Sequence, residues 1–338
     1  MRLAFGGTAG VYAAFHERHA PHEAPGLNLR SGIQSALNAQ GPHAEAVATL
    51  TWVMVVGGAL VFVLVMAFAA YALWGPRRGG WLGSTRCVIA LGFIFPLVTL
   101  SALLVYTFAV ARSIVSEAGP PDLRIEVVGE QWWWRVHYLD SSGRIDFATA
   151  NELVIPAGKS VELTLKAADV IHSFWVPSLA GKLDMIPGHT NRLRIAASKE
   201  GVFRGQCAEY CGGPHAQMGL YVIARNAEDF EAWRVTQRQP RKDVSDETLG
   251  RGRTLFLASC ASCHSVRGTR AQGTLGPDLT HVGSRTSIGA GILPNNEGTL
   301  ASWIAASQHL KPGNLMPSMN IYTGDELRAV AAYLAALR

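Results

Sequence analysis

The chain has 338 residues, of which 49% are hydrophobic, and it carries a formal net charge of +5. This length favours two or three domains. Because lysine and arginine form no dense tract with interleaved aromatic residues, the positive charge does not indicate a nucleic-acid partner. The hydrophobic residues are distributed unevenly, and two long runs near the N-terminus hold much of the excess.

Residues 1–45 contain four histidines and several glycines but no long apolar stretch. Only fragments of a secretory signal pattern occur there, and the sequence leaves open whether the segment is cleaved. We interpret residues 1–45 as an N-terminal extension, poorly ordered or signal-like. A metal-binding tail is the alternative that the histidines suggest.

Two uncharged runs, residues 46–74 and 87–111, each exceed the roughly 20 residues that cross a bilayer as a helix. The short loop between them carries Arg77, Arg78 and Arg86, and positive charges in short loops mark the cytoplasmic side. We therefore expect residues 46–114 to form a transmembrane hairpin among the lipids of the bacterial inner (plasma) membrane. Both termini and everything after Ser113 are then expected on the periplasmic side.

After the hairpin, residues 120–236 have a sequence pattern typical of β-strands. Short β-branched segments such as LRIEVVGE, ELVIP and SVELTLKA are separated by glycine, proline and asparagine, which favours a small β-sandwich or barrel. Residues 228–237 are expected to form a closing helix. The polar segment 237–245, with Pro240, is interpreted as a linker.

Residues 246–338 have a helical pattern. Thr323 and Glu326 form a capping box, and Leu327, Val330 and Leu334 follow at helical spacing. We expect a mostly helical domain. The fold class is therefore multidomain: a two-helix transmembrane hairpin, a β-sandwich or barrel and an all-α domain.

The C-terminal part of the strand region contains a cluster of soft metal donors. Cys207, Cys211, His215 and Met218 lie within twelve residues, and His172 precedes them. Thiolates and a thioether suit copper, and methionine is not used in structural zinc sites. Two thiolates can bridge two coppers, each with one terminal histidine, whereas a mononuclear blue-copper site needs only one cysteine. A zinc loop is the alternative that the donor set disfavours.

The helical region opens with a haem-attachment motif, Cys260-Ala-Ser-Cys263-His264. The two thiols can add to the haem vinyl groups while the histidine binds iron, which predicts a covalent haem c. A thioredoxin-type redox motif lacks this histidine. Met316 and Met319 are both available as the sixth iron ligand, and histidine–methionine ligation suits electron transfer.

The hairpin, the C-x-E-x-C-x3-H-x2-M pattern, DVIHSF, KLDMIPG and GEQWWW together resemble subunit II of cytochrome c oxidase over residues 34–233. The resemblance implies a cupredoxin-like domain with a binuclear copper A centre. It implies copper ligation by the side chains of His172, Cys207, Cys211, His215 and Met218, and by the backbone carbonyl of Glu209. It also implies that the Glu209 side chain binds magnesium (or manganese) at the boundary with subunit I, and that electrons enter at Trp132.

The C-terminal domain resembles class I cytochromes c. In that family the methionine before a proline is the axial ligand, which corresponds to Met316 here. The carbonyl of a proline after the haem motif orients the ligating imidazole, and this role corresponds to Pro277.

The two resemblances together imply subunit II of a haem–copper oxidase with a fused cytochrome c. Electrons from an external cytochrome c or another periplasmic donor would pass from haem c to copper A. They would then reach subunit I, whose haems and copper B reduce O2 to water with proton translocation; subunit III is a further expected partner. The chain departs from the family in one respect, because the second membrane helix has Ile89 where a glutamate is usual. A copper-A subunit of a nitric oxide reductase therefore stays an alternative, as does a stand-alone membrane-bound redox or copper-binding module.

Overall fold

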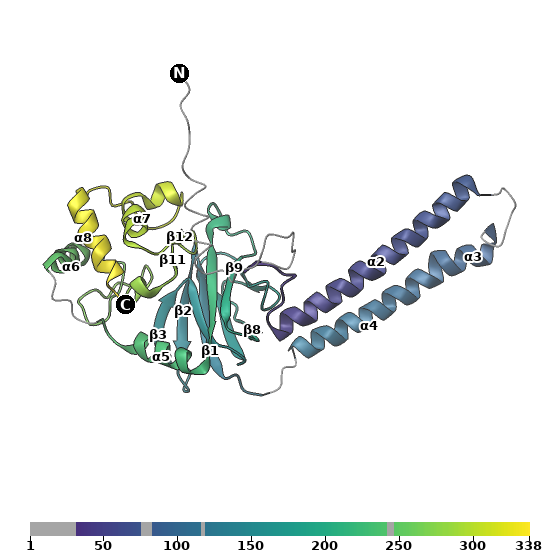
Figure 1. Cartoon of the computed structure of the whole chain (residues 1–338), viewed down its shortest axis with the longest axis horizontal. Helices are drawn as coiled ribbons and strands as arrows, with labels where there is room; N and C mark the ends of the chain where they lie inside the picture. Colours follow the sequence, from purple (N-terminus) through teal and green to yellow (C-terminus); the bar gives the residue numbers. More distant parts are fainter. Residues whose placement is uncertain (1–31, 76–82, 116–118, 242–246) are drawn as a thin grey trace, which may run out of the picture.

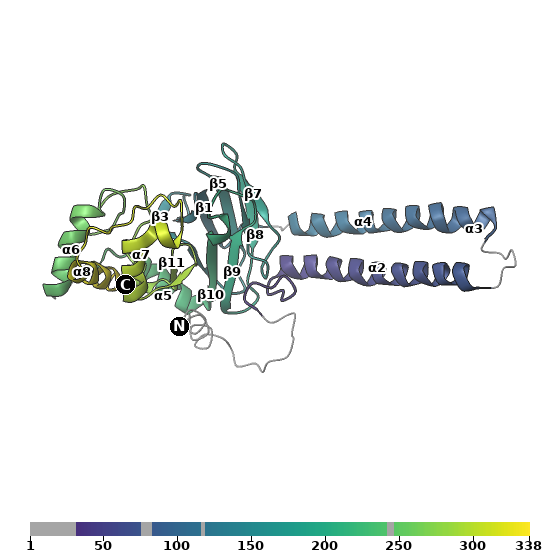
Figure 2. The ribbon, with the colours of Figure 1, turned by 90° about the horizontal axis from the view of Figure 1, so that it is seen from above.

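Three parts follow one another along the long axis of the computed structural model, with the helical hairpin and the C-terminal domain at opposite ends of a β-sandwich (Figures 1 and 2). The structure describes residues 32–75, 83–115, 119–241 and 247–338. Interpretations that concern residues 1–31, the loop arginines Arg77 and Arg78, and linker residues 242–246 lie outside the described residues.

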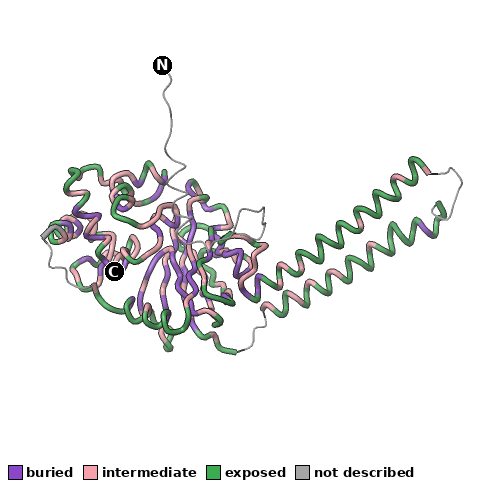
Figure 3. Tube along the Cα trace, viewed as in Figure 1, coloured by how far each residue is buried: buried purple, intermediate pink, exposed green. Residues whose placement is uncertain are grey.

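The hairpin consists of α2 (Pro42–Trp74) and a second helix built from α3 (Thr85–Ile89), a π-helical turn η2 (Ala90–Ile94) and α4 (Phe95–Val115). Both helices are long and apolar enough to cross a membrane, and most of their side chains are exposed (Figure 3). Helix α2 begins at Pro42 and not at residue 46, because proline and an acidic Glu45 both fit a first helical turn. The π turn ends two residues before Pro96, which has no N–H to donate and whose ring crowds the preceding turn.

The sandwich has two five-stranded sheets, ordered β3-β2-β1-β5-β8 and β4-β10-β9-β6-β7. The first contains β1 (Leu123–Glu130), β2 (Trp133–Leu139), β3 (Ile145–Ala150), β5 (Val161–Ala167) and β8 (Asn191–Ile195). The second contains β4 (Glu152–Pro156), β6 (His172–Trp175), β7 (Leu183–Met185), β9 (Gly201–Cys207) and β10 (Gly219–Arg225). Helix α5 (Ala227–Arg238) follows β10, as the sequence predicted.

Alternating residues of the strands fill the space between the two sheets. In β1, Ile125 and Val127 are fully buried while their neighbours are only partly buried, which is the period-two pattern of a half-buried strand. The three consecutive tryptophans of GEQWWW differ in exposure: Trp134 is fully buried in the core, whereas Trp132 and Trp133 are partly exposed. The hydroxyl of the fully buried Tyr138 donates a hydrogen bond to the Val154 carbonyl at 2.7 Å, and this bond connects β2 of the first sheet to β4 of the second.

The segment before α2 packs on the sandwich. The amide of Gln40 donates to the Ser178 carbonyl at 2.7 Å, and the Ser198 amide donates to the Gln40 carbonyl at 2.7 Å. The amide of Ala44, in the first turn of α2, donates to the Leu179 carbonyl at 3.2 Å. The first membrane helix therefore begins in direct contact with the sandwich.

The C-terminal domain contains α6 (Glu247–Ser259), η4 (Val282–Ser284), β11 (Ser287–Ile288), β12 (Leu293–Pro294), α7 (Glu297–Leu310) and α8 (Gly324–Ala335). Both hydrogen bonds of the capping box that opens α8 are present, which confirms the predicted start of this helix. A Cβ at Gly252 would lie 2.0 Å from the Ala329 carbonyl oxygen, so glycine permits the close crossing of α6 and α8. Phe256 and Val330 fill the core beside this crossing.

Candidate metal centre and haem attachment site

Residues 207–218, the copper loop, connect β9 to β10 at one end of the sandwich. The Cys207 amide donates to the Met218 carbonyl at 2.9 Å and closes the loop, and a short 3₁₀ turn, η3 (His215–Gln217), presents His215. His172 begins β6, which pairs with β9 so that Phe174 lies opposite Cys207. Strand pairing therefore brings the distant histidine to the loop.

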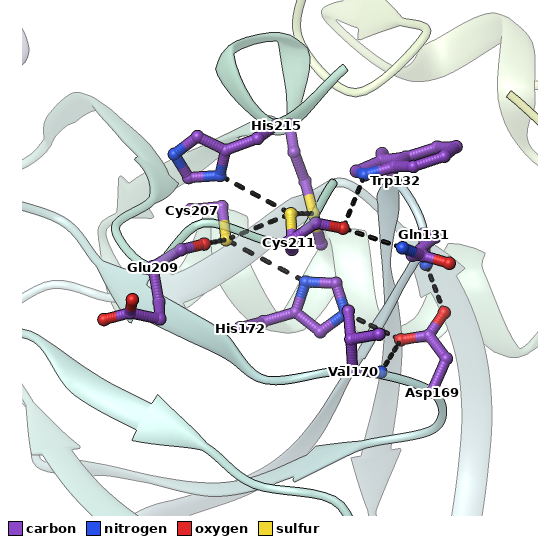
Figure 4. A network of polar contacts seen from close by, with 10 residues as sticks. Gln131, Trp132, Asp169, Val170, His172, Cys207, Glu209, Cys211 and His215 are labelled. Carbon is purple, nitrogen blue, oxygen red and sulfur yellow. Dashed lines mark hydrogen bonds and ion pairs between the residues drawn. The ribbon is translucent and has the colours of Figure 1, made fainter. Parts of the chain in front are cut away.

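The five predicted side-chain ligands converge, and Figure 4 labels four of them, His172, Cys207, Cys211 and His215. Cys207 Sγ and Cys211 Sγ lie 3.8 Å apart, with His172 Nδ1 3.9 Å from Cys207 Sγ and His215 Nδ1 3.5 Å from Cys211 Sγ. Met218 Sδ lies 3.8 Å from Cys211 Sγ. The sulfurs occupy the middle of the cluster, with one imidazole beside each.

The position of Glu209 combines two features. Its backbone carbonyl oxygen lies 3.2 Å from Cys207 Sγ and faces the cluster (Figure 4). Its carboxylate points away and lies 3.7 Å from Lys182 Nζ. The carbonyl is thus placed for a weak copper contact, while the half-exposed carboxylate is directed outward.

The two thiols interact through their mutual hydrogen bond, which lowers the pKa of Cys207 and raises the pKa of Cys211. Burial alone would lower the pKa of His172, but hydrogen bonds to Cys207 and Asp169 outweigh burial and leave it raised. Metal ligation requires deprotonated thiolates and a free lone pair on each imidazole, so metal binding at this site would release protons.

The donor set fits copper. Cys207, Cys211 and His172 are buried and place their ligand atoms within 4.8 Å of one another. Two soft thiolates at the centre and a thioether from Met218, which is fully buried, favour copper over zinc. The arrangement of two sulfurs between two imidazoles suits a pair of metal ions that share both sulfurs.

Several residues around the cluster were not assigned a role from the sequence. Asp169 accepts from His172 Nε2 at 2.8 Å, so His172 Nδ1 faces the sulfurs. Gly129 leaves space for the imidazole, because a Cβ there would lie 2.8 Å from His172 Cδ2. The Gln131 side chain donates to the Cys211 carbonyl at 2.7 Å. Asp169 opens the DVIHSF motif, and its spacing of three residues before the ligand could have identified it.

Trp132 lies directly on the copper loop. Its indole Nε1 donates to the Cys211 carbonyl at 3.0 Å, which joins the ring to a predicted ligand through one backbone group (Figure 4). The ring is partly exposed, and a Cβ at Gly313 of the C-terminal domain would lie 3.9 Å from it. The predicted point of electron uptake is therefore covered in part by the C-terminal domain.

The haem-attachment motif follows the end of α6. The His264 Nδ1–H donates to the Pro277 carbonyl at 2.9 Å, which leaves Nε2 as the nitrogen that can bind iron. Burial lowers the pKa of His264 and favours the neutral ring that ligation requires. Gly276 lies against this ring, because a Cβ there would be 2.5 Å from His264 Cε1. Cys260 and Cys263 are both free and partly exposed, as attachment to haem needs.

The two candidate axial methionines lie in one loop after α7. Met316 is held at both backbone groups: its amide donates to Asn314 Oδ1 at 2.9 Å, and its carbonyl accepts from Ser307 at 2.8 Å. The Met319 amide donates to the Ile304 carbonyl at 2.8 Å. Both side chains pack against the core of the domain, so the choice of Met316 stays a prediction.

Comparisons with known proteins match both domains. A family described as "Cytochrome C oxidase subunit II, periplasmic domain" matches residues 139–225, and a family described as "Cytochrome c" matches residues 249–338. The cytochrome c oxidase subunit 2 of Alkalihalophilus pseudofirmus is 34% identical over 318 residues, which cover 90% of this chain and 91% of that protein. That of Bacillus subtilis is 33% identical, with 64% of this chain and 62% of that protein covered.

A solved structure, the periplasmic domain of subunit II of cytochrome oxidase of Bradyrhizobium japonicum, is 32% identical to the matched region. The match covers 36% of this chain and 96% of that domain, with a TM-score of 0.33.

Proposed function

Because this chain belongs to the cytochrome c oxidase subunit II family, we propose that it relays electrons from a covalent haem c to a binuclear copper A centre and on to a partner subunit that reduces O2 to water. The cytochrome c domain implies the haem, and the subunit II domain suggests the copper. When bound, each centre takes up and releases single electrons. The chain is thus the electron-transfer subunit of an oxidase and performs no oxygen chemistry itself.

The observation that carries this proposal is the convergence of two thiols, two imidazoles and a thioether in the copper loop. In this proposal His172, Cys207, Cys211, His215 and Met218 hold the copper pair. The Glu209 carbonyl adds a weak contact, and its carboxylate would reach a magnesium ion at the boundary with subunit I.

The haem would be attached to Cys260 and Cys263 and ligated by His264 and Met316, with Pro277 orienting the histidine. We assign the copper domain to residues 120–236 and the haem domain to residues 246–338. Their fusion replaces a diffusive encounter by a tethered one at high effective concentration.

The two apolar helices and the family support a membrane-anchored chain with a periplasmic domain. We further propose that both termini face the periplasm and the basic loop the cytoplasm. The partners would be subunit I with its haems and copper B, subunit III, and an external cytochrome c or other periplasmic donor.

The test is purification of the complex that contains this chain, followed by turnover with O2 and with NO. We expect O2 consumption that is lost in Cys207→Ser together with the near-infrared copper absorption, while the haem c spectrum is retained. Cys87→Ser is the control, because Cys87 lies in the hairpin away from the copper loop.

Turnover of NO without O2 would support the nitric oxide reductase alternative, which the absence of a glutamate at Ile89 favours. Unchanged copper absorption in Cys207→Ser would refute the binuclear site.

A further inference from the structure

A buried lysine contributes to the contact between the haem domain and the copper domain. Lys311 follows α7 and is only 2% exposed. Its Nζ donates to the carbonyls of Trp132 at 2.7 Å, Gln217 at 2.8 Å and Gly289 at 3.1 Å. An ammonium group has three N–H donors, and all three are used here. Two of the acceptors belong to the copper domain and one to the haem domain.

Burial of this cation is unfavourable unless its donors are satisfied. Desolvation lowers the pKa of Lys311 to about 7, against a smaller opposing effect of Cys211. The two copper-domain carbonyls are available only when the domains are in contact. The lysine therefore favours this one arrangement of the domains over others that would leave the ammonium group buried without partners.

The acceptors on the copper domain lie next to the metal site. Gln217 immediately precedes the predicted ligand Met218, and Trp132 donates its indole N–H to the Cys211 carbonyl. The Lys311-Pro312-Gly313 turn also rests on this surface, because a Cβ at Gly313 would lie 3.9 Å from both the Trp132 ring and Pro214. The lysine thus contacts the copper loop directly at Gln217 and indirectly through Trp132.

On the haem side, the same turn is joined to Met316 by a short network. Asn314, which is buried, donates to the carbonyls of Lys311 at 2.7 Å and Ser307 at 2.9 Å. Asn314 Oδ1 accepts the Met316 amide, and Ser307 donates to the Met316 carbonyl. A displacement of Lys311 would therefore be transmitted to the loop that carries the proposed iron ligand.

From this geometry we propose that Lys311 is a positioning residue that sets the relative placement of the haem site and the copper loop. The part of the proposal that concerns electron transfer rests on the proposed function. The docking role does not, since it concerns contacts between two parts of the chain.

The experiment compares the full chain with Lys311→Met, which keeps the length of the side chain and removes its donors. Lys159→Met is the matched control, because Lys159 is exposed and pairs with Asp122 at the surface of the copper domain. Amide hydrogen exchange measured by mass spectrometry reports docking directly, since the Gly219 amide donates across the interface to the Ala290 carbonyl at 2.9 Å.

We expect exchange at Gly219 and in residues 131–134 to rise by about tenfold or more in Lys311→Met, because buried acceptors lose their donor. The sandwich core and the α6–α8 core should keep their protection, and Lys159→Met should match the parent chain. In copper-loaded protein, electron transfer from haem c to copper after flash reduction should be slower, with both absorption spectra retained.

Unchanged exchange at Gly219 in Lys311→Met would overturn the proposal, whatever the electron-transfer rate. If Lys311→Met loses protection in both cores, Lys311→Gln replaces it, since an amide keeps two of the three donors. Exchange at Gly219 above the parent value in Lys311→Gln with both cores protected would support the proposal, and a value equal to the parent would overturn it. If the parent chain itself transfers no electrons from haem c to copper, the proposed function is refuted, and raised exchange in Lys311→Met would still support the docking role.

Discussion

Substitution of Asp169 by asparagine tests whether the copper site depends on the group behind its buried histidine. Asp169 Oδ1 accepts from His172 Nε2 at 2.8 Å and from the Val170 amide at 2.7 Å, while Oδ2 accepts the Gln131 amide at 2.6 Å. Every neighbour of the carboxylate in this set is a donor. Asparagine has one oxygen and one NH2 group, so it must direct its own N–H toward one of these donors.

The expected magnitude follows from the loss of a charge-assisted hydrogen bond to His172, which is worth about 1.5–3 kcal/mol. Since about 1.4 kcal/mol corresponds to a factor of ten, copper affinity should fall by roughly 10- to 100-fold. The same range is typical when a carboxylate behind a metal-binding histidine is removed. His172 is fully buried, and its Nε2 has Asp169 as its hydrogen-bond partner in this structure.

Copper affinity would be measured on the full chain by competition with a chelator of known affinity. Asp122→Asn is the control, because Asp122 also accepts a backbone amide, that of Ser160, and lies on the surface beside Lys159. Equal affinities for Asp169→Asn and the parent chain would refute the argument that Asp169 orients His172. A loss of similar size in Asp122→Asn would show a general effect of charge.

Two further predictions concern the haem ligand and acid stability. Met316→Leu should convert haem c to a five-coordinate or histidine-replaced form in its absorption spectrum; if Met319→Leu does so instead, the axial assignment is wrong. The hydrogen bond from His137, aided by Lys166, lowers the pKa of Glu126 from its ordinary 4.5 to about 2. A lowered carboxyl pKa stabilises the fold above pH 4.5, and this stability is lost as pH falls from about 4.5 to 2. Glu126→Gln should therefore reduce the free energy of unfolding at neutral pH by an amount of the order of 1 kcal/mol, because the ion pair is partly solvated. It should also make the melting temperature depend less steeply on pH between about 4.5 and 2. An unchanged slope between these pH values would contradict the assignment.

The elements and the ligand set could be predicted because they depend on local patterns. The alternation of Ile125 and Val127 predicted β1, and the capping box at Thr323 predicted the start of α8. The spacing from Cys207 to Met218 was enough to propose copper, since donor type and separation are both visible in the sequence.

The contacts between the domains could not be predicted, because they join residues far apart in the chain. Lys311 lies in a Lys-Pro-Gly turn, a pattern typical of an exposed loop, and only the fold brings the carbonyls of Trp132 and Gln217 to it. The π turn before Pro96 was missed for a different reason, since proline in a helix can produce a kink, a break or a widened turn.

The packing of residues 32–41 on the sandwich has a practical consequence for preparing the copper domain in water. A protein that starts after the second membrane helix would lack residues 32–41, which contact Ser178, Leu179, Ala196 and Ser198. In the full chain a Cβ at Gly41 would lie 2.1 Å from the Ala196 carbonyl, so the cover is closely fitted. Its removal would uncover backbone groups that now pair with Gln40. Solubility and yield of such a truncated domain should therefore improve when residues 32–41 are supplied again, for example by joining them to its C-terminal end or by adding them as a peptide.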